Sequence, residues 1–160
     1  MLFFPALIHA AWETVTVTNI DNDLQTKVAR IENSDGYSLE IYRDASDAVR
    51  SRITMNNDNR LKEKTCPTYQ VDNRNIGNRS INDAPCISYR QWAEFVLGYI
   101  IDRQVTSTQL HNIMNGNRIT YRFLLENSGY SETSFSLGGS KQALTDALGN
   151  DLKIVTDNTE

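Results

Sequence analysis

Apolar and polar residues alternate along the first third of the chain, a period of two that is typical of β-strands with one buried face. Turn residues rich in Asn, Asp and Gly, including the Asp35-Gly36 pair, interrupt this alternation. The pattern predicts a four-stranded antiparallel meander. Its strands are expected over residues 13–18, 24–31, 37–43 and 49–55.

The period changes after residue 86, where aromatic and aliphatic residues recur at helical spacing. These residues are Tyr89, Trp92, Phe95, Val96 and Tyr99. The spacing predicts a helix over residues 88–101 that starts at Ser88 and packs its apolar face on the sheet. An aromatic ligand groove is the alternative interpretation of the same face.

The remaining third mixes both periods. Residues 106–114 fit a helix capped by Ser107, or a strand that enters a hairpin at Asn115-Gly116; we favour the helix. Strands are expected over residues 118–125 and 133–137, a short strand over 69–72, an edge strand over 152–155, and a helix over 141–148 capped by Ser140. The predicted fold class is α+β and β-dominated: an antiparallel sheet, meander or sandwich-like, with one longer helix and one short C-terminal helix packed on it.

A length of 160 residues fits one domain, which we expect over residues 11–156, with a frayed tail over 157–160. Residues 2–11 are uncharged and almost wholly apolar, which resembles the core of a secretory signal cleaved after Ala10. No basic residue precedes this run, so an N-terminal strand or helix packed on the core is the alternative. The sequence contains no run of apolar residues long enough to span a bilayer.

Cys66 and Cys86 are the chain's two cysteines, and the segment between them is polar. A bond between them would close a loop of roughly 20 residues and stabilise the fold by about 3 kcal/mol. The alternative is two reduced thiols. A zinc site fits less well, because the sequence lacks a CxxC pair and has only His9 and His111 as nitrogen donors. We therefore expect a disulfide and an oxidising compartment, either the periplasm or the exterior.

Charge and motifs make several functions less probable on sequence grounds. The net charge of -4, a pI near 5.2 and scattered basic residues argue against nucleic-acid binding. The sequence contains no P-loop, GxGxxG or GxSxG motif, so we expect no cofactor. We also expect no bound metal, because zinc donors are scarce and the calcium-loop spacing at residues 21–32 has Thr26 where the turn needs Gly. A pair of catalytic carboxylates leaves no spacing signature, so a small hydrolase remains an alternative function.

The polar segment after Cys66 is the best candidate for a contact surface, because loops held on a rigid scaffold often carry binding function. Its candidate contact residues are Asp72, Asn73, Arg74, Asn75, Asn78 and Arg79.

The order of elements supports a family resemblance. Trp12 follows an apolar leader, a meander with Asp35-Gly36 comes next, and a late strand runs into FSLGGSKQALTDAL at residues 135–148. This arrangement resembles the small periplasmic proteins of the invasion-associated locus B type. The resemblance implies an exported, β-rich protein without known catalytic chemistry. Together, these features predict an exported, non-enzymatic binding protein of a bacterial envelope that contacts a protein partner through its stapled loop or a sheet face. A carrier of a small apolar ligand is a further alternative.

Overall fold

The computed structural model describes residues 10–77 and 86–157. Within these residues the chain forms a β-dominated α+β fold with two helices, which confirms the predicted fold class. The elements in chain order are β1 (Glu13–Thr18), β2 (Gln25–Glu32), β3 (Tyr37–Arg43), β4 (Ala48–Met55), β5 (Thr68–Val71), β6 (Ile87–Ser88), β7 (Trp92–Ile101), β8 (Gln104–Thr106), α1 (Thr108–Asn115), β9 (Arg118–Leu124), β10 (Tyr130–Ser136), α2 (Ser140–Leu148) and β11 (Lys153–Val155).

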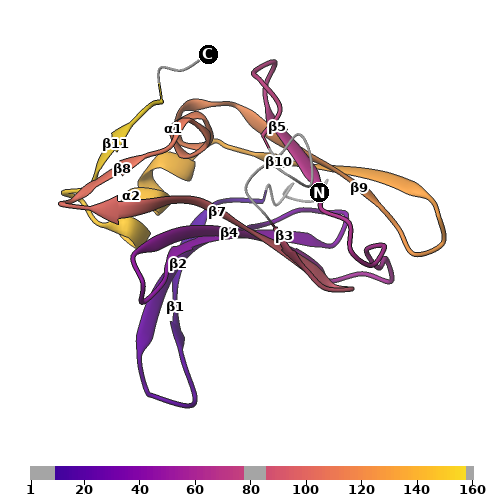
Figure 1. Cartoon of the computed structure of the whole chain (residues 1–160), viewed down its shortest axis with the longest axis horizontal. Helices are drawn as coiled ribbons and strands as arrows, with labels where there is room; N and C mark the ends of the chain where they lie inside the picture. Colours follow the sequence, from indigo (N-terminus) through magenta and orange to yellow (C-terminus); the bar gives the residue numbers. More distant parts are fainter. Residues whose placement is uncertain (1–9, 78–85, 158–160) are drawn as a thin grey trace, which may run out of the picture.

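The larger sheet has the strand order β1-β2-β3-β4-β7-β8-β11, with β6 also paired to β7 (Figure 1). Strands β1 to β4 form the predicted antiparallel meander. The predicted edge strand near residue 152 is β11, which pairs parallel to β8, a short strand that the sequence pattern did not indicate. The sheet is therefore mixed but mostly antiparallel.

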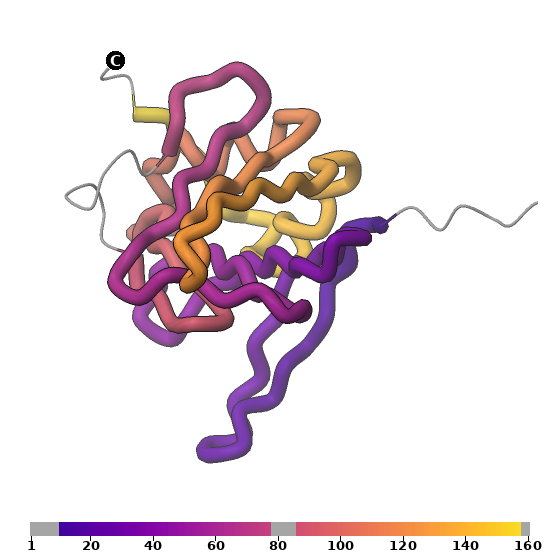
Figure 2. Tube along the Cα trace, turned by 90° about the vertical axis from the view of Figure 1, so that its right-hand side faces the viewer, coloured from indigo at the N-terminus to yellow at the C-terminus, as the bar shows by residue number. Residues whose placement is uncertain are grey.

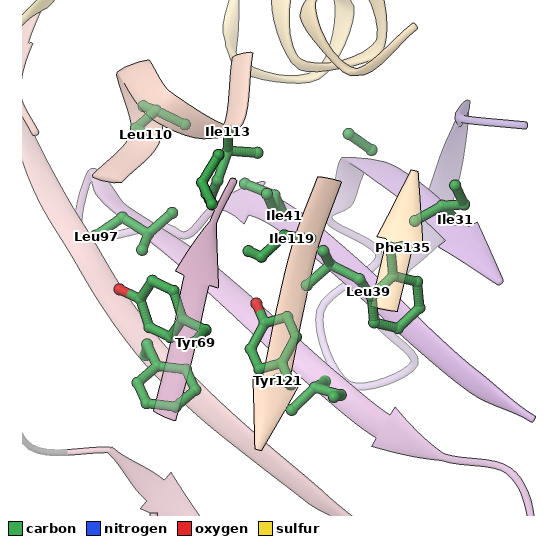
Figure 3. Close-up of a cluster of buried hydrophobic side chains, with 14 of the residues drawn as sticks. Ile31, Leu39, Ile41, Tyr69, Leu97, Leu110, Ile113, Ile119, Tyr121 and Phe135 are labelled. Carbon is green, nitrogen blue, oxygen red and sulfur yellow. The ribbon is translucent and has the colours of Figure 1, made fainter. Parts of the chain in front are cut away.

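A second layer covers one face of this sheet (Figure 1). It consists of a three-stranded sheet, ordered β10-β9-β5, and of the two helices, with α2 packed against β2 and β3. Inward-facing side chains from both layers form one core, which includes Leu39, Ile41, Tyr69, Tyr121 and Phe135 (Figure 3). This two-layer arrangement leaves the opposite face of the larger sheet to solvent.

The helix predicted over residues 88–101 is wrong, because most of this segment is strand β7. β7 pairs with β4 on one side and with β6 and β8 on the other. Aromatic and aliphatic residues stand on both of its faces, because Trp92 and Val96 are half-buried on the face opposite the buried Phe95. A bulge also shifts the register with β4 between Val49 and Arg50. Apolar residues on both faces and a bulge remove simple alternation, so its aromatic residues matched a helical period by chance.

Both shorter helices form where the pattern placed them, but their starts differ. Ser107 caps α1 as predicted, since its Oγ accepts a hydrogen bond from the Leu110 N–H at 3.1 Å. The predicted cap at Ser140 is wrong, because its Oγ instead donates to the Ile113 carbonyl at 2.8 Å. Gly139, with φ of 85°, precedes α2. The Ser140 hydroxyl therefore joins the two helices.

Candidate protein-binding surfaces

A disulfide joins Cys66 to Cys86, with a Cα–Cα distance of 6.0 Å. β5 begins two residues after Cys66, and β6 begins immediately after Cys86. The bond therefore ties the small sheet of the second layer to the edge of the larger sheet. We call the described segment that turns back after β5, residues 72–77, the stapled loop.

Backbone bonds to β5 close the base of the stapled loop. Tyr69 and Gly77 form an isolated antiparallel bridge, in which the Gly77 N–H donates to the Tyr69 carbonyl at 2.9 Å. Gly77 also lies against the Tyr69 ring, where an added Cβ would come within 2.4 Å of a ring carbon. The Tyr69 ring packs in turn on Phe95 and Tyr121 in the core. The position therefore requires glycine for close approach.

Side chains of the stapled loop fix its outer turn. The Asp72 carboxylate accepts hydrogen bonds from the backbone N–H groups of Asn117 and Arg118, at 3.1 and 3.0 Å. Arg74 donates from Nη1 to the Asn112 side chain at 2.7 Å, and Gln70 donates to the Arg74 carbonyl at 2.8 Å. These bonds hold the loop against α1 and the start of β9. Its shape is therefore set before any partner binds.

The structure separates the predicted contact residues into two kinds. Asp72 is half-buried and structural, whereas Asn73, Arg74 and Asn75 are exposed at the tip, followed by Ile76. Asn78 and Arg79, which the sequence also indicated, lie outside the described residues. In Figure 1 the stapled loop is the magenta turn that projects beyond β5.

A second projection lies at the other end of the molecule, where the β1–β2 hairpin extends away from the second layer (Figures 1 and 2). Large apolar side chains are exposed near its tip: Val17 is 49% exposed, Ile20 95% and Leu24 56%. Val17 follows Val15 on the face opposite the α2-facing Thr14. The sequence predicted the two strands, but not that their outer half would be uncovered.

The solvent-facing side of the larger sheet carries an ion-pair network that sequence reasoning missed. Its centre is Glu94 on β7, which is only 6% exposed. Glu94 accepts hydrogen bonds from the Tyr42 hydroxyl at 2.6 Å, from Arg50 Nη1 at 3.1 Å and from Arg52 Nε at 2.9 Å. Arg52 also lies over the Trp92 ring, 4.0 Å from its centroid. Alternation in β4 indicated that Arg50 and Arg52 share a face, but the helix predicted for residues 88–101 concealed their partner.

Electrostatics in this network favour a structural role for its carboxylates. Burial alone would raise the pKa of Asp44, but hydrogen bonds from Ser46, Arg50 and nearby backbone N–H groups outweigh it and lower that pKa to about 2. Burial and the hydrogen bond to Glu94 raise the pKa of Tyr42 to about 12. Glu94 is occupied by three donors. Both carboxylates of the network are therefore engaged in joining neighbouring strands of the sheet.

A groove of about 320 Å³ with a mixed polar and apolar lining lies between α1, α2 and β11. Leu144 and Leu148 line it, together with His111 and Lys141. The predicted carrier of an apolar ligand required a cavity between a sheet and a helix. This groove instead opens to the surface between two helices and an edge strand.

Neither a cluster of metal ligands nor a membrane-spanning helix is present in the described part of the chain. No group of three or more His, Cys, Asp and Glu side chains within residues 10–77 and 86–157 is placed to hold a metal ion. Neither described helix has the length and apolar character needed to cross a membrane.

Comparison with known proteins finds a similar fold but no similar sequence. No protein-family model matches the sequence, and no curated protein matches it. The fold is similar to that of invasion associated protein B from Bartonella henselae, with a TM-score of 0.54. The match covers 88% of this chain and 93% of that chain, at 11% identity. The resemblance seen in the sequence is therefore confirmed at the level of the fold.

Proposed function

We propose that this chain is an exported, non-enzymatic protein of a bacterial envelope that binds a protein partner through its stapled loop. The observation that carries the proposal is the rigid construction of that loop. The disulfide, the Tyr69–Gly77 bridge and the bonds of Asp72 and Arg74 fix its backbone, while Asn73 and Asn75 stay exposed. A preformed projecting loop loses little conformational entropy when it enters a partner's cleft.

The disulfide and the similarity in fold support the proposed compartment. A disulfide persists in the periplasm or outside the cell and is rare in a reducing cytosol. The apolar segment at residues 2–11 supports export, and we propose that it is removed after Ala10. The fold likeness to invasion associated protein B from a bacterium supports an envelope protein.

Mass spectrometry of the protein from its native host, without reductant, tests export directly. We expect a chain that has lost its leader and two hydrogens. A full-length chain with two alkylatable thiols would contradict the export proposal.

Site-specific photo-crosslinking tests the binding role. A benzoylphenylalanine at Asn75 is expected to capture a discrete protein from the envelope fraction of the native host. Excess unlabelled wild-type chain should compete for this protein, whereas the Asn73→Glu/Asn75→Glu variant should not. The control position is Asn127, an exposed residue in the turn between β9 and β10. Equal capture from both positions, or none from Asn75, would overturn the loop as the contact surface.

A further inference from the structure

β1 forms one edge of the larger sheet and pairs only with β2 among the residues that the structure describes. Its six residues are exposed except for Val15, which is half-buried. The hairpin extends beyond the body of the molecule (Figure 2), which leaves this edge accessible to another strand.

The hydrogen-bond pattern of the hairpin shows which backbone groups face outward. The Asn19 N–H donates to the Leu24 carbonyl at 2.8 Å, so this pair is hydrogen-bonded. Because hydrogen-bonded and non-hydrogen-bonded pairs alternate in an antiparallel ladder, Val17 and Val15 bond inward to β2. The N–H and C=O groups of Thr14, Thr16 and Thr18 therefore point away from β2, along the free edge.

This edge lacks the features that normally prevent strands from pairing. The sequence ETVTVT contains no Lys and no Pro, and the register between β1 and β2 is unbroken by a bulge. Its Thr and Val residues favour extended backbone. An exposed, regular edge of this kind is a template for another strand.

We propose that β1 pairs with β1 of a second copy of this chain, antiparallel and around a twofold axis at Thr16. In this register Thr16 faces Thr16, Thr14 faces Thr18, and Val15 faces Val17. The outward N–H and C=O groups of the three threonines then bond to those of the partner copy, and the two larger sheets become one continuous sheet.

The sequence of β1 favours a second copy over an unrelated strand, because this register is self-complementary. The charged Glu13 faces Asn19, so no like charges meet. Val15 and Val17 of both copies come together on one face beside Val28, and the threonines share the other face. A twofold contact of this kind uses the same patch on both subunits and closes at a dimer.

Sedimentation velocity of the full chain over about 5–500 μM tests the pairing, because a contact this small is expected to be weak. We expect the average mass to rise with concentration toward that of a dimer.

Thr16→Pro removes an outward N–H but no bond to β2, and it should weaken association at least tenfold, on the order of two lost hydrogen bonds. Thr16→Val keeps the N–H and should still associate. A monomer at every concentration, or equal association by the proline variant, would overturn the proposal.

Cysteine cross-linking tests the register independently of any effect of proline on folding. Residues that face each other in a hydrogen-bonded pair lie about 5.5 Å apart at Cα, within the range of a disulfide. Thr16→Cys should form a covalent dimer on mild oxidation. Thr14→Cys or Thr18→Cys alone should not, but a mixture of the two should cross-link. Cross-linking by Thr16→Cys no faster than by Asn127→Cys, at an exposed position away from β1, would exclude this register.

Discussion

The stapled loop and the β1–β2 hairpin project from opposite ends of this molecule, and they differ in how firmly the rest of the chain holds them. The stapled loop after β5 is held by the disulfide, by the Tyr69–Gly77 bridge and by side chains that bond to α1 and β9. The β1–β2 hairpin is held at its base, where Thr14 Oγ1 donates to the Ala143 carbonyl on α2. Its outer half is covered by neither helix and exposes Ile20 and Leu24.

The difference bears on the two contacts proposed above. A loop whose backbone is fixed in advance presents side chains to a partner of complementary shape. A strand with an open edge presents backbone hydrogen-bonding groups, which any strand of matching register can complete. The two projections therefore support separate contacts, and substitutions in one should not affect the other.

Loss of the disulfide should have the largest effect. The bond links two residues that are 20 positions apart in the sequence. Replacing both Cys66 and Cys86 by Ser opens this loop in the unfolded chain, and it should reduce the free energy of unfolding by about 3 kcal/mol. Urea unfolding of both proteins under non-reducing conditions measures this loss. The sedimentation behaviour of the folded variant should not change, because β1 lies at the other end. An unchanged urea midpoint would show that the staple does not stabilise the fold.

Gly77→Ala should cost about 1–3 kcal/mol, because the new methyl group would overlap the Tyr69 ring within the packed core. Gly138→Ala is the matched control, since the nearest atom to a Cβ at that site is Ser136 Oγ at 3.6 Å. Thermal unfolding of the two variants measures the difference. Equal stability of both variants would mean that the Tyr69 ring shifts at little cost to make room for the methyl group.

Side-chain hydrogen bonds should stabilise the turn between β3 and β4, as they do the stapled loop. Because the pKa of Asp44 is lowered from 3.8 to about 2 in the folded protein, its ionised form contributes stability above pH 4. That stability is lost as the pH falls from about 4 toward 2, where the folded carboxylate takes up its proton. Asp44→Asn should cost about 1–2 kcal/mol at pH 7 and flatten the acid dependence in this window. Asp21→Asn, at the exposed tip of the β1–β2 hairpin, should leave both unchanged when urea unfolding is measured from pH 2 to 7.

Substitution of one aspartate in each projection, both with left-handed backbone, compares the stapled loop with the β1–β2 hairpin directly. Asp72 has φ of 49° and Asp23 has φ of 55°, and asparagine tolerates both conformations. Asp72→Asn weakens the charge-assisted bonds to Asn117 and Arg118, and it should cost about 1 kcal/mol. Asp23→Asn should cost less than half of that in the same urea titration. A larger loss of unfolding free energy from Asp23→Asn than from Asp72→Asn would contradict the difference between the two projections.

The smallest effect is expected at the apolar tip. Ile20→Ser should change stability by less than about 0.5 kcal/mol, because the side chain is 95% exposed. Its association measured by sedimentation should also match the wild type, since Ile20 lies beyond the residues that pair around Thr16. A destabilisation above 1 kcal/mol would indicate that the tip packs on another part of the chain.

Local patterns in the sequence were sufficient for the elements that have one buried face. The alternation of residues 13–55 predicted the meander, and Ser107 marked the start of α1. The pattern failed for β7, where apolar residues on both faces and a bulge remove the period of two. The network at Glu94 was missed because residue 94 was placed in a helix. Its donors also lie on β3 and β4, 42 to 52 residues earlier in the chain, beyond the reach of any local pattern.

The two projections were predictable to different degrees. The spacing of Cys66 and Cys86 indicated a stapled polar segment, and the structure fixes its described part through Asp72 and Arg74. The exposure of the β1–β2 hairpin depends on where the second layer ends. That boundary is set by the packing of α2 on β2 and β3, which no local pattern in β1 reveals.

Hydrogen exchange at single amides, measured at low and high protein concentration, tests the contrast between the hairpins most directly. The N–H groups of Asp72, Arg74 and Gly77 bond to backbone carbonyls and should be protected at both concentrations. The N–H of Thr16 should exchange rapidly in dilute protein and slowly in concentrated protein. Rapid exchange of Thr16 at every concentration, or exchange of Gly77 as fast as that of Thr16, would contradict the account.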